Sequence, residues 1–219
     1  MNNRKTDVFK RITALVIAFA MLFSVSAFAE EGRGKSNHVK NAGKAIILVG
    51  DSRVWHMSAL CSNEARRNYY FVYANGKGIF DWANNYNGFK SDTIAAMRKY
   101  PGAPVVLMLG VNYNQASTDY PRLEAYNAFI NTYWAHRFIV STVGKTAGQS
   151  GNYSNTRIRA FNNKIKSWYA PTIVPVYDLY ALLDAKITSR SDTRNGDGVH
   201  YKTATYNKIL YNLRAFAGR

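Results

Sequence analysis

The chain has 219 residues and a formal net charge of +16 at pH 7, from 29 basic and 13 acidic residues. Such a charge favours polyanionic surroundings, for example a cell wall, an acidic polysaccharide or lipid head groups, although a basic surface that only aids solubility is the alternative. The sequence contains no zinc finger, arginine-rich tract or metal-ligating cluster of Cys and His, so we expect neither nucleic acid nor a metal or other cofactor.

The first 29 residues have the pattern of a signal peptide. An apolar run over residues 12–28 follows four basic residues and ends in Ala27-Phe28-Ala29, which suits cleavage after Ala29. The run is about 17 residues long, at the lower limit for spanning a bilayer, so cleavage is preferred to the alternative of a retained anchor. Removing residues 1–29 leaves 25 basic and 12 acidic residues, a net charge of +13. We expect a secreted or cell-surface protein with no stable membrane span.

A flexible leader is predicted over residues 30–43, where glycine and serine alternate with charged residues. Residues 44–219 are long enough for one domain of ordinary size, and we expect a monomer. The lone Cys61 cannot form an intramolecular disulfide. It follows Val54 and Met57 at near-helical spacing and is predicted to be a buried structural thiol.

Short apolar runs alternate with helical patterns along this domain. The predicted strands are 45–49, 69–73, 105–109, 138–143 and 172–176. The predicted helices are 54–66, 91–100, one from Pro121, 157–168, and one from Thr203 to about Gly218. The third of these places Leu123, Tyr126, Ile130 and Trp134 on one face.

Strand–helix alternation predicts an α/β fold, a three-layer α/β/α sandwich built on a five-stranded parallel sheet. Pro175 in the fifth predicted strand indicates a sheet edge, and a flavodoxin-like order 2-1-3-4-5 places that strand at an edge. The same order puts the ligand crevice between the first and third strands, at their carboxyl ends.

Three motifs carry residues suited to acyl transfer. Gly50-Asp51-Ser52 ends the first predicted strand, Gly110-Val111-Asn112 follows the third, and Asp197-Gly198-Val199-His200 lies near the C-terminus. Each motif alone is more simply a helix cap or a turn. Together they supply a serine nucleophile, a histidine base, a carboxylate to orient it and an amide donor for an oxyanion.

These motifs resemble the marker blocks of the SGNH hydrolases, the GDSL esterase and lipase superfamily. The resemblance covers nearly the whole domain and implies Ser52 as nucleophile, His200 as base and Asp197 as its orienting carboxylate. It implies an oxyanion hole made by the Ser52 N–H, the Asn112 amide and a glycine N–H after the second strand. Gly78 is the preferred glycine, and Gly76 is the alternative.

Two positions depart from the usual blocks: Arg53 follows the serine, and Tyr113 follows Asn112. We predict substrate contact for Arg53, Trp82 and Tyr113. Aromatic rings near the motifs, which include Trp55 and Tyr201 as well, can stack on sugars beside a cleft; the alternative for a tryptophan is core packing.

The sequence therefore predicts a secreted serine esterase that hydrolyses short-chain acyl esters, O-acetyl in particular, on a small molecule or polysaccharide. One alternative is acyl transfer to a glycan hydroxyl. The other is a non-catalytic module of the same fold that binds cell wall or polysaccharide.

Overall fold

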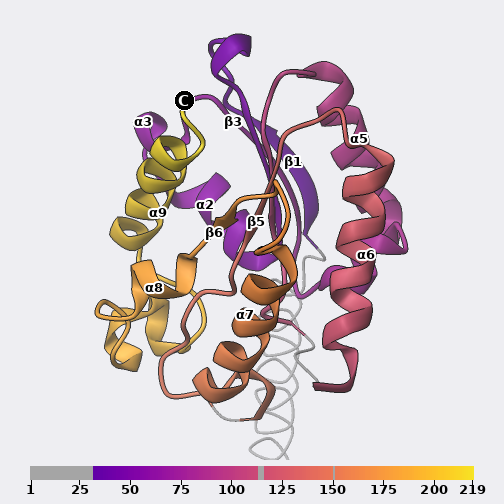
Figure 1. Cartoon of the computed structure of the whole chain (residues 1–219). Coiled ribbons are helices and arrows are strands. Elements are labelled where there is room, and N and C mark those ends of the chain that lie inside the picture. Colours follow the sequence, from indigo (N-terminus) through magenta and orange to yellow (C-terminus); the bar gives the residue numbers. More distant parts are fainter. Residues whose placement is uncertain (1–31, 113–115, 150) are drawn as a thin grey trace, which may run out of the picture. The chain divides into compact units, whose positions relative to one another are not determined.

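The computed structural model describes residues 32–112, 116–149 and 151–219. The predicted signal peptide and Tyr113 lie outside these residues. Residues 33–219 form one unit in which strands and helices alternate (Figure 1).

A six-stranded sheet forms the middle layer, in the order β1-β3-β2-β4-β5-β6. Its strands are β1 (Arg33–Asn37), β2 (Ile46–Gly50), β3 (Tyr69–Ala74), β4 (Val105–Met108), β5 (Phe138–Ser141) and β6 (Val176–Tyr177). The strands from β2 to β6 are parallel, and their order is the predicted 2-1-3-4-5. The predicted α/β fold is confirmed, with one additional strand.

That additional strand corrects the prediction of a flexible leader over residues 30–43. Residues 33–37 pair antiparallel with β3, with Lys35 opposite Val72, and Ala42–Lys44 form a short 3-10 helix, η1. The strand is polar and is held by main-chain pairing to the edge of β3 and by an ion pair from Lys35 to Asp92, 2.9 Å long. A search for apolar runs cannot detect a strand of this kind.

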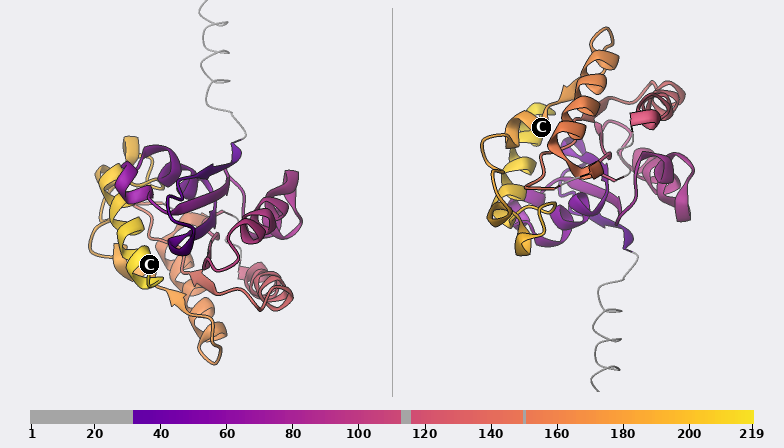
Figure 2. Two further views of the ribbon diagram at one scale, coloured as in Figure 1. Left: turned by 90° about the horizontal axis from the view of Figure 1, so that it is seen from above. Right: turned by 90° about the horizontal axis from the view of Figure 1, so that it is seen from below.

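Two layers of helices cover the sheet (Figure 2). One face is covered by α2 (Ser52–Leu60), α3 (Asn63–Arg66), α8 (Leu179–Leu183) and α9 (Thr203–Phe216). The other face is covered by α4 (Ile79–Ala83), α5 (Phe89–Lys99), α6 (Asp119–Thr132) and α7 (Asn155–Tyr169). Successive residues of β2 enter opposite cores: Ile46 and Leu48 pack on the first face, and Ile47 and Val49 on the second. Both faces of the strand are buried, which explains its unbroken apolar run.

Short 3-10 helices occur in the connections: η2 (Tyr86–Gly88), η3 (Ala116–Thr118), η4 (Gly151–Tyr153), η5 (Arg190–Asp192) and η6 (Arg194–Gly196). None of the helices in the described part of the chain has both the length and the apolar character needed to cross a bilayer.

Several predicted boundaries differ from the structure. The helix predicted over 54–66 is two helices, because Ser62 caps α3 by accepting a hydrogen bond from the Ala65 N–H, 3.2 Å away. Cys61 lies between them and is buried, as predicted. Helix α6 ends at Thr132, so Trp134 is 80% exposed rather than part of its apolar face. Strand β6 begins only after Pro175, whose carbonyl accepts from Val140.

Candidate active site

The nucleophile candidate Ser52 is the first residue of α2, directly after β2. The Asp51 carboxylate caps this helix by accepting from the Arg53 N–H, 2.9 Å away. A methyl group at Gly50 would overlap Val54 and lie 2.9 Å from the Met108 carbonyl, so only glycine lets the helix start this close to the sheet. The turn therefore presents Ser52 at the carboxyl edge of the sheet.

Asp51 is buried, and its carboxylate accepts hydrogen bonds from backbone N–H groups. Its carboxylate also accepts a hydrogen bond from the Val111 N–H, which ties the end of β2 to the loop after β4. Burial raises the pKa of Asp51, although the charge of Arg53 and these hydrogen bonds act in the opposite direction.

The Asp197–His200 segment is organised by one carboxylate. Oδ1 of Asp197 accepts from the N–H groups of Val199 and His200, both at 2.8 Å, and Oδ2 lies 2.7 Å from Nδ1 of His200. Partial burial acts to raise the pKa of Asp197, but these hydrogen bonds outweigh it, so the pKa lies below its ordinary value. The spacing of three residues thus lets one carboxylate hold both the turn and the imidazole.

The other ring nitrogen of His200 meets the serine. Nε2 of His200 lies 2.8 Å from Oγ of Ser52, although the two residues are 148 positions apart. The result is a continuous hydrogen-bonded chain from the Ser52 hydroxyl to an ionised carboxylate. This arrangement can transfer a proton from the hydroxyl to the imidazole while the carboxylate stabilises the resulting imidazolium.

Asn112 is bonded to the loop that carries the two candidate glycines. Nδ2 of Asn112 donates to the Lys77 carbonyl at 3.0 Å, which joins the loop after β4 to the loop after β3. The Tyr153 hydroxyl lies 3.5 Å from the Asn112 Oδ1. An amide nitrogen has two hydrogens, so Asn112 can donate a second hydrogen bond while it holds the Lys77 carbonyl.

The glycine donor is less simple. The Gly78 N–H donates to the Asp81 carboxylate at 2.8 Å, at the start of α4. Gly76 has a φ of +67°, in the left-handed region, and is exposed, and a Cβ added there would meet no atom within 4 Å. Both glycines therefore stay candidates for the third donor.

Two of the residues predicted to touch substrate are buried, which argues against such contact. The Arg53 side chain is 4% exposed, and Trp82 is fully buried against Phe129 with its indole N–H donating to Thr93. The helical positions of both residues turn them inward, and their proximity to the motifs in sequence gave no information on direction. Trp55, by contrast, is partly exposed.

Sequence reasoning missed His56, which lies four residues after Ser52 on α2. Its ring packs 4.5 Å from that of His200, and its Nδ1 lies 3.1 Å from a guanidinium nitrogen of Arg194. Burial, with the charges of His200 and Arg194, lowers the pKa of His56 to about 4. The spacing i, i+4 places both side chains on one helix face and was the available signal.

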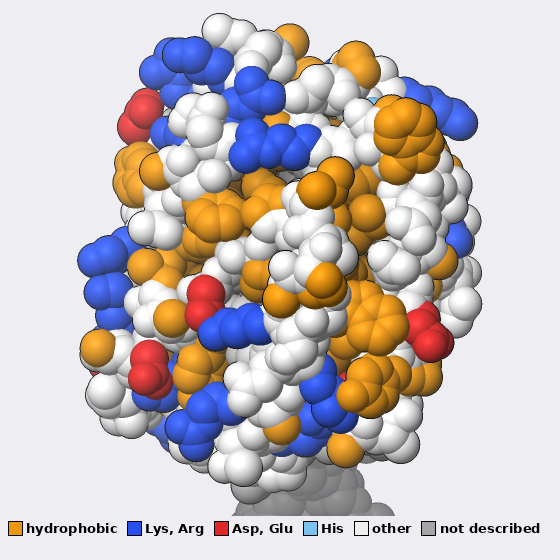
Figure 3. Space-filling model, in the orientation of Figure 1, with side chains coloured by type: hydrophobic (Ala, Val, Ile, Leu, Met, Phe, Trp, Pro, Cys, Tyr) orange, Lys and Arg blue, Asp and Glu red, His pale blue; other side chains and the backbone are white. Residues whose placement is uncertain are grey.

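Two further observations concern metal ions and polyanionic partners. In the described part of the chain, no group of three or more His, Cys, Asp or Glu side chains is arranged to hold a metal ion. On the face shown in Figure 3, Lys and Arg side chains lie in several separate groups and not in one continuous patch.

The fold, and not the sequence, relates this chain to known proteins. No family model and no curated protein matches the sequence. A GDSL-like lipase from Bacteroides thetaiotaomicron superimposes with a TM-score of 0.65 at 15% identity, over 80% of this chain and 88% of the lipase. An acetyl xylan esterase gives 0.60 at 16% identity, over 78% of this chain and 99% of the esterase. A carbohydrate esterase family 3 protein from Talaromyces cellulolyticus gives 0.56 at 20% identity, over 78% and 95% of the two chains.

The chain has the SGNH hydrolase fold. The resemblance drawn from the sequence motifs is thus confirmed for the architecture. Within this SGNH fold, Ser52 and Asn112 follow β2 and β4, and His200 lies in the loop before α9, where its Nε2 is 2.8 Å from Oγ of Ser52. Their roles in a reaction are a matter of proposal.

Proposed function

We propose that the protein is a serine carboxylesterase that removes short acyl groups, O-acetyl in particular, from carbohydrate. The observation that carries this proposal is the hydrogen-bonded chain from Oγ of Ser52 through His200 to Asp197, with contacts of 2.8 and 2.7 Å. A buried structural histidine does not need a serine on one nitrogen and a carboxylate on the other. A non-catalytic binding module would have no use for this alignment.

In the proposed reaction, Oγ of Ser52 bonds to the ester carbonyl carbon as its proton passes to Nε2 of His200. The carbonyl oxygen becomes an oxyanion, which accepts hydrogen bonds from Asn112 and backbone N–H groups; one such donor is typically worth about 3–4 kcal/mol of barrier. The ester C–O bond then breaks, and the leaving oxygen takes the proton from Nε2. Water repeats the sequence on the acyl-enzyme, releasing the acid and restoring Ser52.

The carbohydrate preference rests on two supports. An acetyl xylan esterase and a carbohydrate esterase are among the solved structures of similar fold. In addition, Trp55 and Tyr153 are partly exposed, and they lie against His56 and Asn112 respectively. Aromatic rings so placed can stack on a sugar while the acyl group points to Ser52.

We further propose that the protein is exported and loses residues 1–29, as the basic, apolar and small-residue segments of its N-terminus favour. Mass spectrometry of protein recovered from the host's extracytoplasmic fraction should give a chain that starts at Glu30. The net charge of +13 would then attract an acidic glycan, and added salt should weaken this attraction.

Hydrolysis of p-nitrophenyl acetate by the wild type and by Ser52→Ala tests the reaction. We expect Ser52→Ala to lose activity by at least about a thousandfold, because the nucleophile is removed while the binding groups remain. A fluorophosphonate should label the wild type once, at Ser52. Retained activity in Ser52→Ala, or labelling at another residue, would refute the assignment.

The substrate class is tested separately, by comparing acetyl with octanoyl esters and by measuring acetate release from acetylated xylan. Faster cleavage of the acetyl ester is expected. A rate that peaks at the octanoyl ester would indicate a lipase.

A further inference from the structure

Arg53 is a buried arginine that directly follows the proposed nucleophile in sequence. Its side chain runs inward from the first turn of α2 and bonds to two separate loops. Nε donates to the Val199 carbonyl at 3.2 Å, and Nη1 donates to the Gly144 carbonyl at 3.0 Å. One guanidinium therefore joins the helix of Ser52 to the residue before His200 and to the loop after β5.

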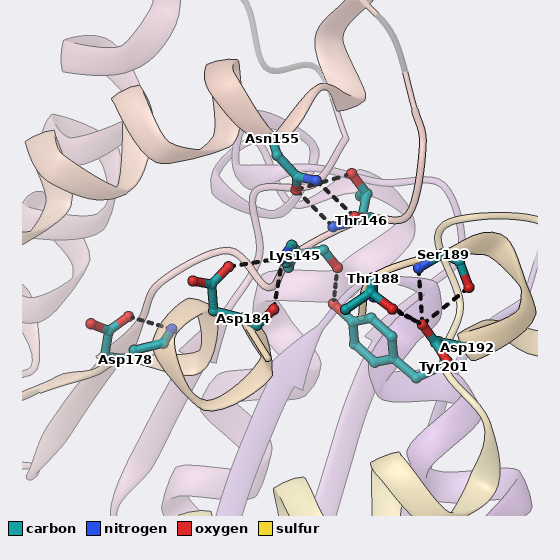
Figure 4. A network of polar contacts seen from close by, with 10 residues as sticks. Lys145, Thr146, Asn155, Asp178, Asp184, Thr188, Ser189, Asp192 and Tyr201 are labelled. Carbon is teal, nitrogen blue, oxygen red and sulfur yellow. Dashed lines mark hydrogen bonds and ion pairs between the residues drawn. The ribbon is translucent and has the colours of Figure 1, made fainter. Parts of the chain in front are cut away.

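The same guanidinium contacts the residue after His200. Cζ of Arg53 lies 4.9 Å from the centre of the Tyr201 ring, over its face. The Tyr201 hydroxyl in turn donates to the Lys145 carbonyl at 2.8 Å, so the ring is fixed at both ends (Figure 4). Arg53 thus contacts both sequence neighbours of His200 and does not touch the imidazole itself.

This placement is costly for folding. A buried guanidinium loses its hydration, and in the described part of the chain no carboxylate forms a direct ion pair with Arg53. The buried carboxylate of Asp51 offsets part of this cost, because the charges of the two residues attract each other at longer range. Its Nη2 atom is buried and makes no hydrogen bond. Packing alone does not explain an arginine here, since an apolar side chain of similar length could fill the space, and the attraction to Asp51 does not require the two carbonyl contacts.

We infer that Arg53 is a positioning residue that fixes the imidazole of His200 relative to the hydroxyl of Ser52. The inference rests on the proposed function, since it assigns a part in the same site. Ser52 and Arg53 are adjacent on one rigid helical turn, so a loop bound to Arg53 keeps its distance from Ser52. The planar fork of arginine reaches two carbonyls and a ring face at once, which the single ammonium of lysine does not.

Two variants test this role, Arg53→Met and Arg53→Lys. For Arg53→Met we expect kcat on p-nitrophenyl acetate to fall about 10- to 100-fold, because small displacements of a reacting group cost this much. KM should change little, since Arg53 is buried and presents almost no surface to a substrate. Arg53→Lys should recover only part of the loss, because lysine keeps the charge but not the fork.

Arg214 provides a matched control. Its Nη2 donates to the carbonyls of Glu64, Ala65 and Arg67, and its Cζ lies 5.7 Å from the Tyr69 ring centre, so it too joins α9 to a loop through backbone carbonyls and a ring face. It differs from Arg53 in a 3.9 Å ion pair with Glu64, and among the described residues none of its bonds is to the His200 loop. Arg214→Met should lower the thermal midpoint and leave kcat unchanged. An equal loss of kcat in both methionine variants, or an unchanged kcat in Arg53→Met, would overturn the inference.

A readout without turnover separates this inference from the proposed function. Proton NMR of the wild type should show the His200 Nδ1–H held by Asp197 as a downfield signal, and Arg53→Met should weaken or shift it while Arg214→Met does not. If Ser52→Ala keeps esterase activity, the proposed function fails whatever the NMR shows. If activity depends on Ser52 but Arg53→Met changes neither the NMR signal nor kcat, only the positioning role of Arg53 is refuted. Should Arg53→Met not fold, Arg53→Lys carries the same comparison.

Discussion

The ring of His56 packs edge-to-face on the ring of His200, with centroids 4.5 Å apart and an interplanar angle of 64°. Arg194 joins the same two residues: its guanidinium contacts His56, and its backbone N–H donates to the His200 carbonyl at 2.6 Å. The turn of α2 that carries Ser52 thus contacts the His200 loop through His56 as well as through Arg53. Because the pKa of His56 is lowered to about 4, this ring is neutral at neutral pH.

The lowered pKa of His56 predicts a pH dependence of stability. An unfolded histidine takes up a proton near pH 6.5, but folded His56 does so only near pH 4, so the unfolded state binds more protons between these values. The free energy of unfolding should therefore fall as the pH drops from about 6.5 towards 4. Urea unfolding at a series of pH values should show a shallower fall for His56→Phe than for the wild type. Identical slopes would contradict the burial of a neutral His56.

Asn112→Ala should reduce kcat far more than it changes KM. An oxyanion donor acts mainly in the transition state, and losing one typically costs about 100- to 1000-fold in kcat. Steady-state kinetics on an acetyl ester measures both constants. A change confined to KM would mean that Asn112 binds the substrate and does not stabilise the oxyanion.

Asp81→Ala distinguishes the two candidate glycines. The Asp81 carboxylate accepts a hydrogen bond from the Gly78 N–H. The substitution therefore frees this N–H and removes a negative charge beside it. If Gly78 is the donor, kcat/KM should rise, while the loss of the cap destabilises the protein by about 1 kcal/mol. An unchanged or lower kcat/KM, at a temperature where the variant is folded, would favour Gly76.

The sequence predicts the parts of this molecule that depend on periodicity and on local motifs. The buried strand predicted over residues 45–49 is β2, Ile46–Gly50, one residue further along, and the expected turn from Asp197 to His200 is present. The predictions from sequence were wrong where they depended on the direction in which a side chain points or on hydrogen bonding between main chains. Arg53 and Trp82 lie beside the motifs but point inward, and β1 has no apolar pattern because its pairing uses only the backbone.

Gly144→Ala should disturb the His200 loop from the opposite side. A methyl group at Gly144 would overlap the Tyr201 hydroxyl and lie 3.1 Å from both Leu179 and Leu183. Such overpacking typically costs about 1–3 kcal/mol. Thermal unfolding should show this loss, and kcat should fall because Tyr201 follows His200 directly. Normal kcat in a destabilised variant would show that the loop tolerates the movement of Tyr201.

Trp55 and Trp82 should respond to mutation in opposite ways. Trp82 is fully buried against Phe129 and Tyr126, so Trp82→Ala should destabilise the protein by about 3–5 kcal/mol, with Trp82→Phe as a milder control.

Trp55 is partly exposed and lies 4.5 Å from His56, so Trp55→Ala should unfold near the wild-type temperature. If Trp55 stacks on a sugar, this variant should raise KM for acetylated xylan and leave KM for p-nitrophenyl acetate almost unchanged. An equal change in KM for both substrates would show that Trp55 supports the site without contacting the glycan.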